Sequence, residues 1–416
     1  MANTLKFGAG QWATKEGSTL AYNDENDNYK PLPFDFTRAS NATVVNKAGL
    51  IETVGNGIPR IDFLGNTQGA LKLEPQRTNL ITYSEDFSNG NWAKYGTTVT
   101  SGFTSPDGSL NAFKLVEDTN NSKHFISRNN LFTPDGVTRD YSIFVKEGEK
   151  RYIFITNVTT TNNDINCAVF DTRDGVFTNT NNPTYISNRN VTTLSNGWYR
   201  IDFTSNVNSF SYDNFYIGIS SSETMSGVSY QGDGTSGVYI YGAQLEAGSY
   251  ATSYIPTQGS AVTRLAESCN NGANEQVINS TEGVLYAELS GFSNDLVRYS
   301  ISDGSNSNNI YIELSSSSVS AVGRLSAVNQ FSIYSSQTIT NYNKIAIKYK
   351  QNDFALWING VEVGTDTSGN TYPANTLDSF QFNRGDGGIL FYGETRDIKL
   401  YNTALTDQEL AALTTI

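Results

Sequence analysis

Apolar and polar residues alternate with a period of two through most of the 416-residue chain. Such alternation places successive side chains on opposite faces of the backbone and is typical of β-strands. One short helix is predicted near the end, where Thr406 and Glu409 have the spacing of a capping box. The pattern predicts an all-β fold, and its clearest strands are at 141–145, 151–155, 215–219, 238–241 and 344–349.

Turn residues divide the chain into modules. After the strand at 238–241, Gly242, Gly248, Pro256 and Gly259 interrupt the alternation, and a new set of strand patterns follows. A chain of this length has room for two or three domains. We predict two consecutive β-sandwich (jelly-roll) modules with an irregular but β-rich segment before them. The predicted boundaries are 1–33 for the N-terminal segment, 34–82 for a β-rich connector, 83–258 for the first sandwich and 259–416 for the second.

The second sandwich contains the strongest hairpin signal in the chain. Asn359 and Gly360 separate the apolar run at 354–358 from the shorter run at 361–363. Both central positions of a type I′ turn need a positive φ, which Asn and Gly adopt readily. We therefore predict a tight hairpin at this point.

The N-terminal segment is irregular but rich in aromatic residues. Phe7, Trp12, Tyr22 and Tyr29 are too many large apolar groups for a solvated tail, although 23–28 is a polar run typical of a turn. A segment of this kind buries its rings either on another subunit or on its own neighbours. Two interpretations stay open: a docking segment, and a strand that completes the adjacent sheet.

Net charge and cysteine content narrow the classes of partner. The formal charge is -13, from 41 acidic and 28 basic residues, and this sign repels phosphate backbones. We expect no nucleic-acid partner. No apolar run is long enough to span a bilayer, and no basic-then-apolar start predicts a signal peptide. Two cysteines, Cys167 and Cys269, far apart in the sequence, suit assembly in a reducing cytoplasm.

Residue types needed for catalysis are scarce. His124 is the only histidine, which argues against a Ser-His-Asp arrangement and against a histidine-rich metal site. No glutamate has further carboxylates two and five residues on, the spacing expected of a sandwich glycosidase. Glu85 and Asp86 are neighbours, which on a strand would point to opposite faces. We therefore predict a protein that is not an enzyme.

Calcium is considered as a ligand of the second sandwich, because side-chain oxygen donors of the kind it prefers are available there. Asp303, Asp353, Asp386 and Asp397 lie in or near predicted loops of the second sandwich. Their spacing does not form a site, so we predict no cofactor and interpret these residues as solvated loop acids.

Four arginines recur among apolar residues: Arg38, Arg60, Arg77 and Arg264. A guanidinium in such surroundings is a candidate ligand for an acidic polysaccharide. The favoured interpretation is structural, because a planar group with five donors can satisfy loop carbonyls and carboxylates.

Several motifs resemble a module of tailed-bacteriophage virion proteins. They include Gly-Ala-Gln-Leu-Glu-Ala-Gly at 242–248, Ser-Tyr-Ile-Pro-Thr at 253–257 and Ala-Val-Thr-Arg at 261–264. That group comprises tail fibres, head fibres and decorations that carry carbohydrate-binding-module-like jelly rolls. The final 150 or so residues are similar to laminin G and concanavalin A-like sandwiches.

The resemblance implies sites in the first sandwich. Trp92 and Trp198 lie in stretches that look like the carbohydrate-binding group, and flat rings can cover the apolar face of a sugar. Packing in the core is the alternative for both, and it is favoured more strongly for Trp198. Trp92 and Tyr95 are the candidate ligand-binding residues.

The resemblance also implies a place and a role. We expect a structural protein on the virion surface, assembled in the host bacterial cytoplasm and docked to other capsid or tail proteins through the N-terminal segment. Because single sugar sites are weak, we expect a homotrimer that adheres to host or environmental glycans. Two other functions stay open: a purely architectural capsid or tail protein, and a polysaccharide depolymerase.

Overall fold

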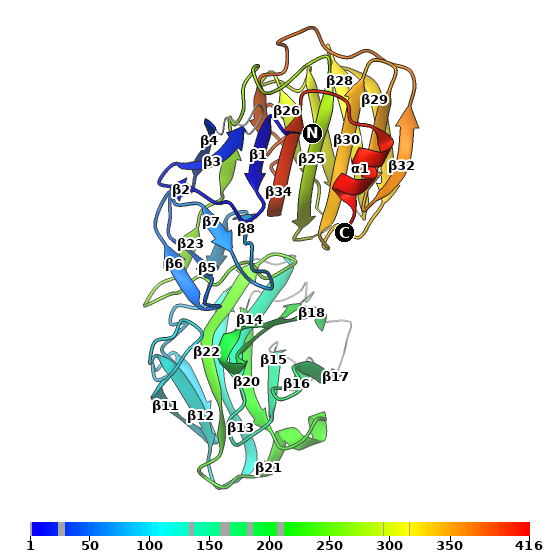
Figure 1. Ribbon diagram of the computed structural model, residues 1–416. Helices are drawn as coiled ribbons and strands as arrows, with labels where there is room; N and C mark the ends of the chain where they lie inside the picture. Colours follow the sequence, from blue (N-terminus) through cyan, green and yellow to red (C-terminus); the bar gives the residue numbers. More distant parts are fainter. Residues whose placement is uncertain are drawn as a thin grey trace. The chain divides into compact units, whose positions relative to one another are not determined.

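The computed structural model describes residues 2–23, 30–132, 137–158, 167–180, 186–205, 212–293, 295–315 and 317–416. Over these residues the chain is all-β with one α-helix, which confirms the predicted fold class (Figure 1). Its contacts divide it into two compact units. Unit 1 comprises 1–47, 54–75 and 265–416, and unit 2 comprises 48–53 and 76–264.

Unit 1 is a sandwich of two antiparallel sheets around one apolar core. Leu285 and Ile347 of the larger sheet meet Ile312 and Ala321 of the smaller sheet in this core. The smaller sheet contains β26 (Val297–Ser302), β27 (Asn309–Ser315), β28 (Ser318–Leu325), β29 (Val328–Ser336) and β33 (Ser379–Gln381). The larger sheet contains β1 (Leu5–Gly8), β2 (Thr14–Lys15), β3 (Ser18–Asn23), β4 (Lys30–Thr37), β7 (Arg60–Asp62), β8 (Ala70–Leu73), β24 (Ser268–Asn270), β25 (Glu282–Gly291), β30 (Asn343–Lys350), β31 (Phe354–Ile358), β32 (Val361–Asp366) and β34 (Gly393–Tyr401).

The N-terminal strands are integral to unit 1. Strand β1 lies between β3 and β34, and Phe7 is opposite Ile398 in the register (Figure 1). The Phe7 ring is fully buried in the core. The division of the chain therefore differs from the predicted order of consecutive segments, because the N-terminal residues and part of the connector pair with the C-terminal sandwich. For β1, the strand-completing interpretation is confirmed.

Two local predictions in unit 1 are confirmed. Asn359 and Gly360 have φ values of 52° and 86°, and they join β31 to β32 with Ile358 opposite Val361. The helix α1 (Asp407–Thr414) begins with the predicted capping box between Thr406 and Glu409. It lies against β30, β31 and β32 and buries Leu410 on them.

Unit 2 is a second sandwich with its own core. One sheet contains β10 (Trp92–Tyr95), β13 (Asn121–Phe132), β15 (Tyr152–Val158), β16 (Cys167–Asp171), β17 (Val176–Thr180), β20 (Tyr212–Ser220) and β21 (Ser229–Gln231). We call it sheet A. The other, sheet B, contains β11 (Thr97–Phe103), β12 (Ala112–Glu117), β14 (Arg139–Lys146), β18 (Ile186–Thr193), β19 (Tyr199–Ser205) and β22 (Gly237–Ala247). Inward residues of both sheets, among them Ile126, Ile217, Ile143 and Ile240, form the core.

The remaining elements are short. In unit 2, β9 (Arg77–Asn79) pairs with β23 (Val262–Arg264), and the described residues include the 3-10 turns η2 (Ser195–Gly197) and η3 (Met225–Val228). Strand β5 (Ala42–Val45) belongs to unit 1, and β6 (Ile51–Val54) runs from unit 2 into unit 1.

Candidate functional site

Trp92, the predicted sugar platform, lies inside unit 2. Only 1% of its surface is exposed, its ring packs 5.0 Å from that of Phe87, and its Nε1 donates to the Tyr83 carbonyl at 2.9 Å. The ring faces are therefore covered by the core, and Trp92 cannot serve as a platform in this structure. Trp198 is equally buried and donates to the Thr104 carbonyl at 3.2 Å, so the core interpretation is confirmed for both.

Tyr95, the second predicted ligand-binding residue, points the other way. It lies three positions after Trp92 on the same strand, and an odd spacing places two side chains on opposite faces of a sheet. The ring is 47% exposed. It stacks on Phe125 with centroids 4.7 Å apart and planes at 15°, and Phe125 stacks on Tyr216 at 4.9 Å and 27°. We call Tyr95, Phe125 and Tyr216 the aromatic ladder.

The strand order of sheet A assembles the ladder. Strand β13 lies between β10 and β20, with Tyr95 opposite Phe125 and Ser127 opposite Tyr216. Gly218 supplies the space at the centre. A Cβ at this position would lie 2.7 Å from the Cβ of Phe125 and 2.3 Å from the ring of Phe154. Phe125 and Phe154 can both pack over β20 at this point only because Gly218 has no side chain.

The outer face of sheet A is covered near β15 and β16 and is exposed at β10. Phe154, Val169 and Val228 form a small apolar cluster, and Phe125 packs against it from the ladder side. The turn η3 supplies Val228 and Met225 to this cluster. Tyr95 is on β10, the strand at the opposite end of the sheet order. The covered cluster thus fixes Phe125, and Phe125 in turn supports the exposed ring of Tyr95.

The predicted docking residues have different environments. Phe7 is in the core of unit 1, so its ring is not available to a partner. Trp12 is half-buried with its edge against Phe7 at 5.4 Å, and it donates to the Gln68 carbonyl at 2.8 Å. Tyr22 is half-buried on β3 opposite Lys6. Tyr29 lies outside the described residues. Docking through this segment stays a prediction.

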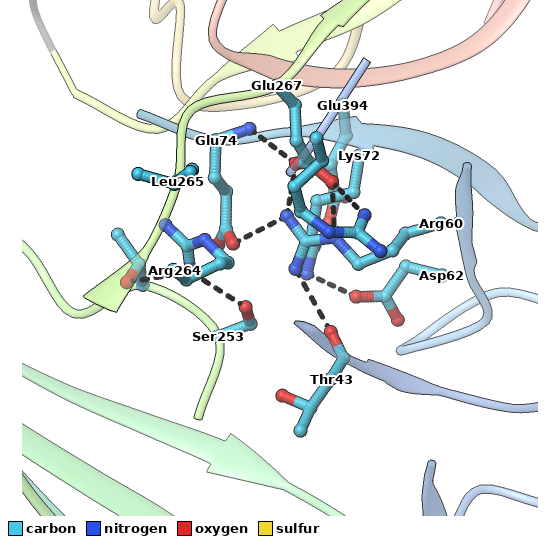
Figure 2. Close-up of polar contacts among 12 residues, drawn as sticks. Thr43, Arg60, Asp62, Lys72, Glu74, Ser253, Arg264, Leu265, Glu267 and Glu394 are labelled. Carbon is cyan, nitrogen blue, oxygen red and sulfur yellow. Dashed lines mark hydrogen bonds and ion pairs between the residues drawn. The ribbon is translucent and has the colours of Figure 1, made fainter. Parts of the chain in front are cut away.

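Arg60 occupies a buried cluster of opposite charges in unit 1 (Figure 2). Its Nε donates to Glu267 Oε1 at 2.9 Å, and its Nη2 pairs with Glu74 Oε2 at 2.7 Å. Arg38 pairs with the same Glu267 carboxylate at 2.7 Å. Burial alone lowers the pKa of Arg60, but the attraction of Glu267 and Glu74 outweighs burial and raises it. The structural interpretation is therefore confirmed for Arg38 and Arg60, because their carboxylate partners belong to the chain itself.

Arg264 also binds groups of its own unit. It is buried and donates to the hydroxyl groups of Thr252 and Ser253 at 3.2 and 3.0 Å. Arg77 lies opposite it in the β9–β23 pair and places its guanidinium 5.5 Å from the ring of Tyr250. These contacts satisfy loop groups, as the structural interpretation predicts.

His124 has a structural environment. It is fully buried, and its ring nitrogens lie 2.7 Å from the Gly96 carbonyl and 3.1 Å from the Tyr230 carbonyl. Both nitrogens are therefore occupied by backbone groups.

The four acids considered for calcium are engaged with protein partners. Asp353 pairs with Lys348, Asp386 with Arg384 and Asp397 with Lys399. Asp303 accepts hydrogen bonds from Ser305 and Asn308. Within the described ranges, no group of three or more His, Cys, Asp or Glu side chains is placed to hold a metal ion. None of the helices in those ranges has the length and hydrophobicity to cross a bilayer.

Comparison with known proteins gives distant structural similarities. No family model matches the chain, and no curated protein matches it. A CBM40 domain of a Ruminococcus gnavus IT-sialidase matches with a TM-score of 0.30 and 15% identity, over 33% of this chain and 84% of that one. Domain 4 of a GH43 extracellular arabinanase from Geobacillus stearothermophilus, in complex with arabinotriose, matches with a TM-score of 0.28 and 15% identity, over 40% and 83%. Domains LG4-5 of mouse laminin α1 match with a TM-score of 0.23 and 10% identity, over 69% and 92%.

Proposed function

We propose that unit 2 binds glycans and that a sugar ring packs on Tyr95. The observation that carries this proposal is the exposed Tyr95 ring, held in place by the stack beneath it. One face of the ring rests on Phe125, so the exposed half consists of the opposite face and the edge. The C–H face of a pyranose can pack on such a ring, and the tyrosine hydroxyl can donate to a sugar oxygen.

The ladder lowers the cost of binding by fixing the platform beforehand. A free tyrosine side chain on a surface loses rotamer freedom when a ligand orders it. Here Phe125 lies between Tyr95 and Tyr216, and the covered apolar cluster packs against Phe125. Little freedom is left for Tyr95 to lose.

A glycan array tests this proposal. The full chain is expected to bind a subset of glycans without free amino groups above background, and Tyr95→Ala is expected to lose that signal. Tyr334 is the matched control, because it is a 76% exposed tyrosine in unit 1, and Tyr334→Ala is expected to bind normally. Absence of binding to any glycan, or equal binding by Tyr95→Ala, would contradict the proposal and favour a purely architectural role.

We also propose that the chain is a non-enzymatic structural protein on the surface of a tailed-phage particle, assembled in the host cytoplasm. The support is the set of motifs at 242–248, 253–257 and 261–264, which form the end of β22 and the segment up to β23. Electron micrographs of virions labelled with an antibody to this chain test the location. Labelling of heads or tails is expected, and unlabelled virions would contradict it.

A homotrimer would compensate for the weakness of one tyrosine platform. Several weak sites on one assembly bind a surface far more tightly than each site alone. The mass of the protein in solution at micromolar concentration tests this part of the proposal. A trimer is expected, and a monomer would contradict it.

A further inference from the structure

Unit 2 contains a second candidate site, which shares no residue with the aromatic ladder. It is a cavity of about 610 Å³ between the loop that precedes β10, the start of β12 and the segment that follows β22. This volume is typical of pockets for small molecules. Its apolar lining includes Phe113, Pro256 and Leu110, of which Leu110 is 72% exposed.

Two adjacent carboxylates line this cavity. Glu85 lies in a bend and Asp86 lies outside any strand, so the expectation that they face opposite sides does not apply here, and both residues line the same pocket. Sequence position alone could not show this, because the alternation rule applies only where the backbone is extended.

The Glu85 carboxylate is held from behind by tyrosines. Its Oε1 accepts hydrogen bonds from the hydroxyl of Tyr241 at 2.8 Å and from that of Tyr254 at 3.2 Å. Tyr254 is itself fixed by Ser84 at 2.7 Å. Burial raises the pKa of Glu85 although both tyrosine hydrogen bonds lower it. The geometry gives a carboxylate of fixed position at the wall of the cavity.

The pocket has a surplus of hydrogen-bond acceptors. Among the lining residues, all of which the structure describes, none is Lys, Arg or His. The Glu85 and Asp86 carboxylates therefore have no cationic partner among the lining residues, and the pocket favours an occupant that brings donors and positive charge.

Asp107 serves the fold and does not line the pocket. Its oxygens accept from Ser105, Ser109, Asn111 and the Tyr241 hydroxyl. These bonds hold the turn between β11 and β12. Asp107 is therefore committed to the turn and is not available to an occupant of the pocket.

We propose that this pocket binds the primary ammonium group of an amino sugar that lacks its N-acetyl group. An ammonium has three donors and no acceptor, which matches the carboxylates of Glu85 and Asp86. Charge-assisted bonds to carboxylates are the strongest that such a ligand can make. Phe113, Pro256 and Leu110 offer apolar surface to the sugar ring. An acidic sugar is disfavoured, because its carboxylate would face two like charges.

Calorimetric titration of the full chain with two matched oligosaccharides tests this inference. A glucosamine tetramer is expected to bind at least about ten-fold more tightly than the N-acetylglucosamine tetramer, which has the same backbone without the charge. Glu85→Gln and Asp86→Asn are each expected to weaken the glucosamine tetramer by about ten-fold. Glu223→Gln, which removes an exposed acid elsewhere in unit 2, is the control and is expected to bind normally.

Other outcomes would overturn the proposal. Equal affinity for the two tetramers would show that the ammonium is not recognised. Unchanged binding by both folded pocket variants would place the ligand elsewhere. Binding of calcium chloride alone, lost in Glu85→Gln, would make the site one for an inorganic cation, and release of new reducing ends would make it catalytic. Tyr95→Ala is expected to leave the glucosamine titration unchanged, so failure of the ladder and failure of this pocket are distinguishable.

Discussion

Strand β10 shows how one strand serves two purposes on its two faces. Trp92 on the inner face packs against Phe87 in the core, and Tyr95 on the outer face stacks on Phe125 in the open. Both are aromatic, both stand in one four-residue strand, and both are candidate sugar platforms by residue type. Their position in the alternation decides which one a ligand can reach.

The outer faces of the two sheets of unit 2 differ in charge and in exposure. Sheet A presents neutral rings that stay open at Tyr95. Sheet B presents Asp140, Asp202 and Glu246, which are buried. In the segment after β22, Thr252 donates to Glu246 at 2.9 Å from its backbone nitrogen, while Asp202 accepts from Asn190 and Asp140 accepts from Thr204. The exposed outer surface of sheet A is therefore aromatic and neutral, whereas the charged outer surface of sheet B is buried.

The largest effect is expected from Trp92→Ala. Removal of a fully buried indole from a core costs roughly 3 to 5 kcal/mol of unfolding free energy. Denaturant unfolding of the full chain measures this loss, and Trp92→Phe, which keeps a ring but loses the hydrogen bond to Tyr83, is expected to lose less. A Trp92→Ala protein as stable as the wild type would mean that the ring is not in the core.

A pH-dependent effect of similar size is expected on sheet B. Burial raises the pKa of Asp202 from its ordinary 3.8 to about 6, although the hydrogen bond from Asn190 and the charge of Arg200 lower it. The folded state therefore holds this proton more tightly than the unfolded state. Stability is greatest below the unfolded pKa and falls as the pH rises from about 4 through about 6, by roughly 3 kcal/mol for this group.

Asp202→Asn isolates the contribution of this carboxyl group to the pH dependence of stability. The variant is expected to be more stable than the wild type at pH 7.5, and the difference is expected to vanish at pH 4. Thermal unfolding over this range measures both. A variant that is less stable than the wild type at pH 7.5 would show that the ionised carboxylate stabilises the fold.

A smaller loss is expected from Gly218→Ala at the centre of the ladder. The new methyl group would overlap the Phe154 ring and the Phe125 side chain, which costs about 1 to 3 kcal/mol when a packed site must shift. Because Phe125 supports Tyr95, glycan affinity is expected to fall as well. Gly175→Ala changes another glycine of unit 2 away from the ladder and controls for a general loss of stability. Normal affinity in a folded Gly218→Ala protein would show that the support is dispensable.

Local signals predicted much of the fold. Asn359-Gly360 and the Thr406–Glu409 capping box act through residues close in sequence, and both are found as predicted. The same reasoning could not place β1, whose Leu5 pairs with Leu400. Its hydrogen bonds join opposite parts of the chain, and no periodicity within the segment carries that information.

The candidate site was predicted only in part. Tyr95 was named as a candidate, and its role in binding stays a prediction, but Phe125 and Tyr216, on which its ring stacks, were missed. A signal was available, because in the strand at 215–219 the apolar positions Phe215, Ile217 and Ile219 alternate with Tyr216, an aromatic residue where a polar one is expected. The strand order that brings β10, β13 and β20 together could not be read from the sequence. The sequence analysis predicted that the arginines bind carboxylates and carbonyls of the chain itself, but it did not identify Glu267 as the partner that Arg38 and Arg60 share.

The dissociation constant of the best array glycan for Tyr95→Ala, Tyr95→Phe and the wild type tests the central claim most directly. Tyr95→Ala is expected to change unfolding free energy by no more than about 0.5 kcal/mol and to weaken binding by at least about ten-fold. Tyr95→Phe keeps the stacked ring and is expected to retain most of the affinity. Wild-type affinity in a folded Tyr95→Ala protein would contradict the account, because it would separate glycan binding from the open face of sheet A.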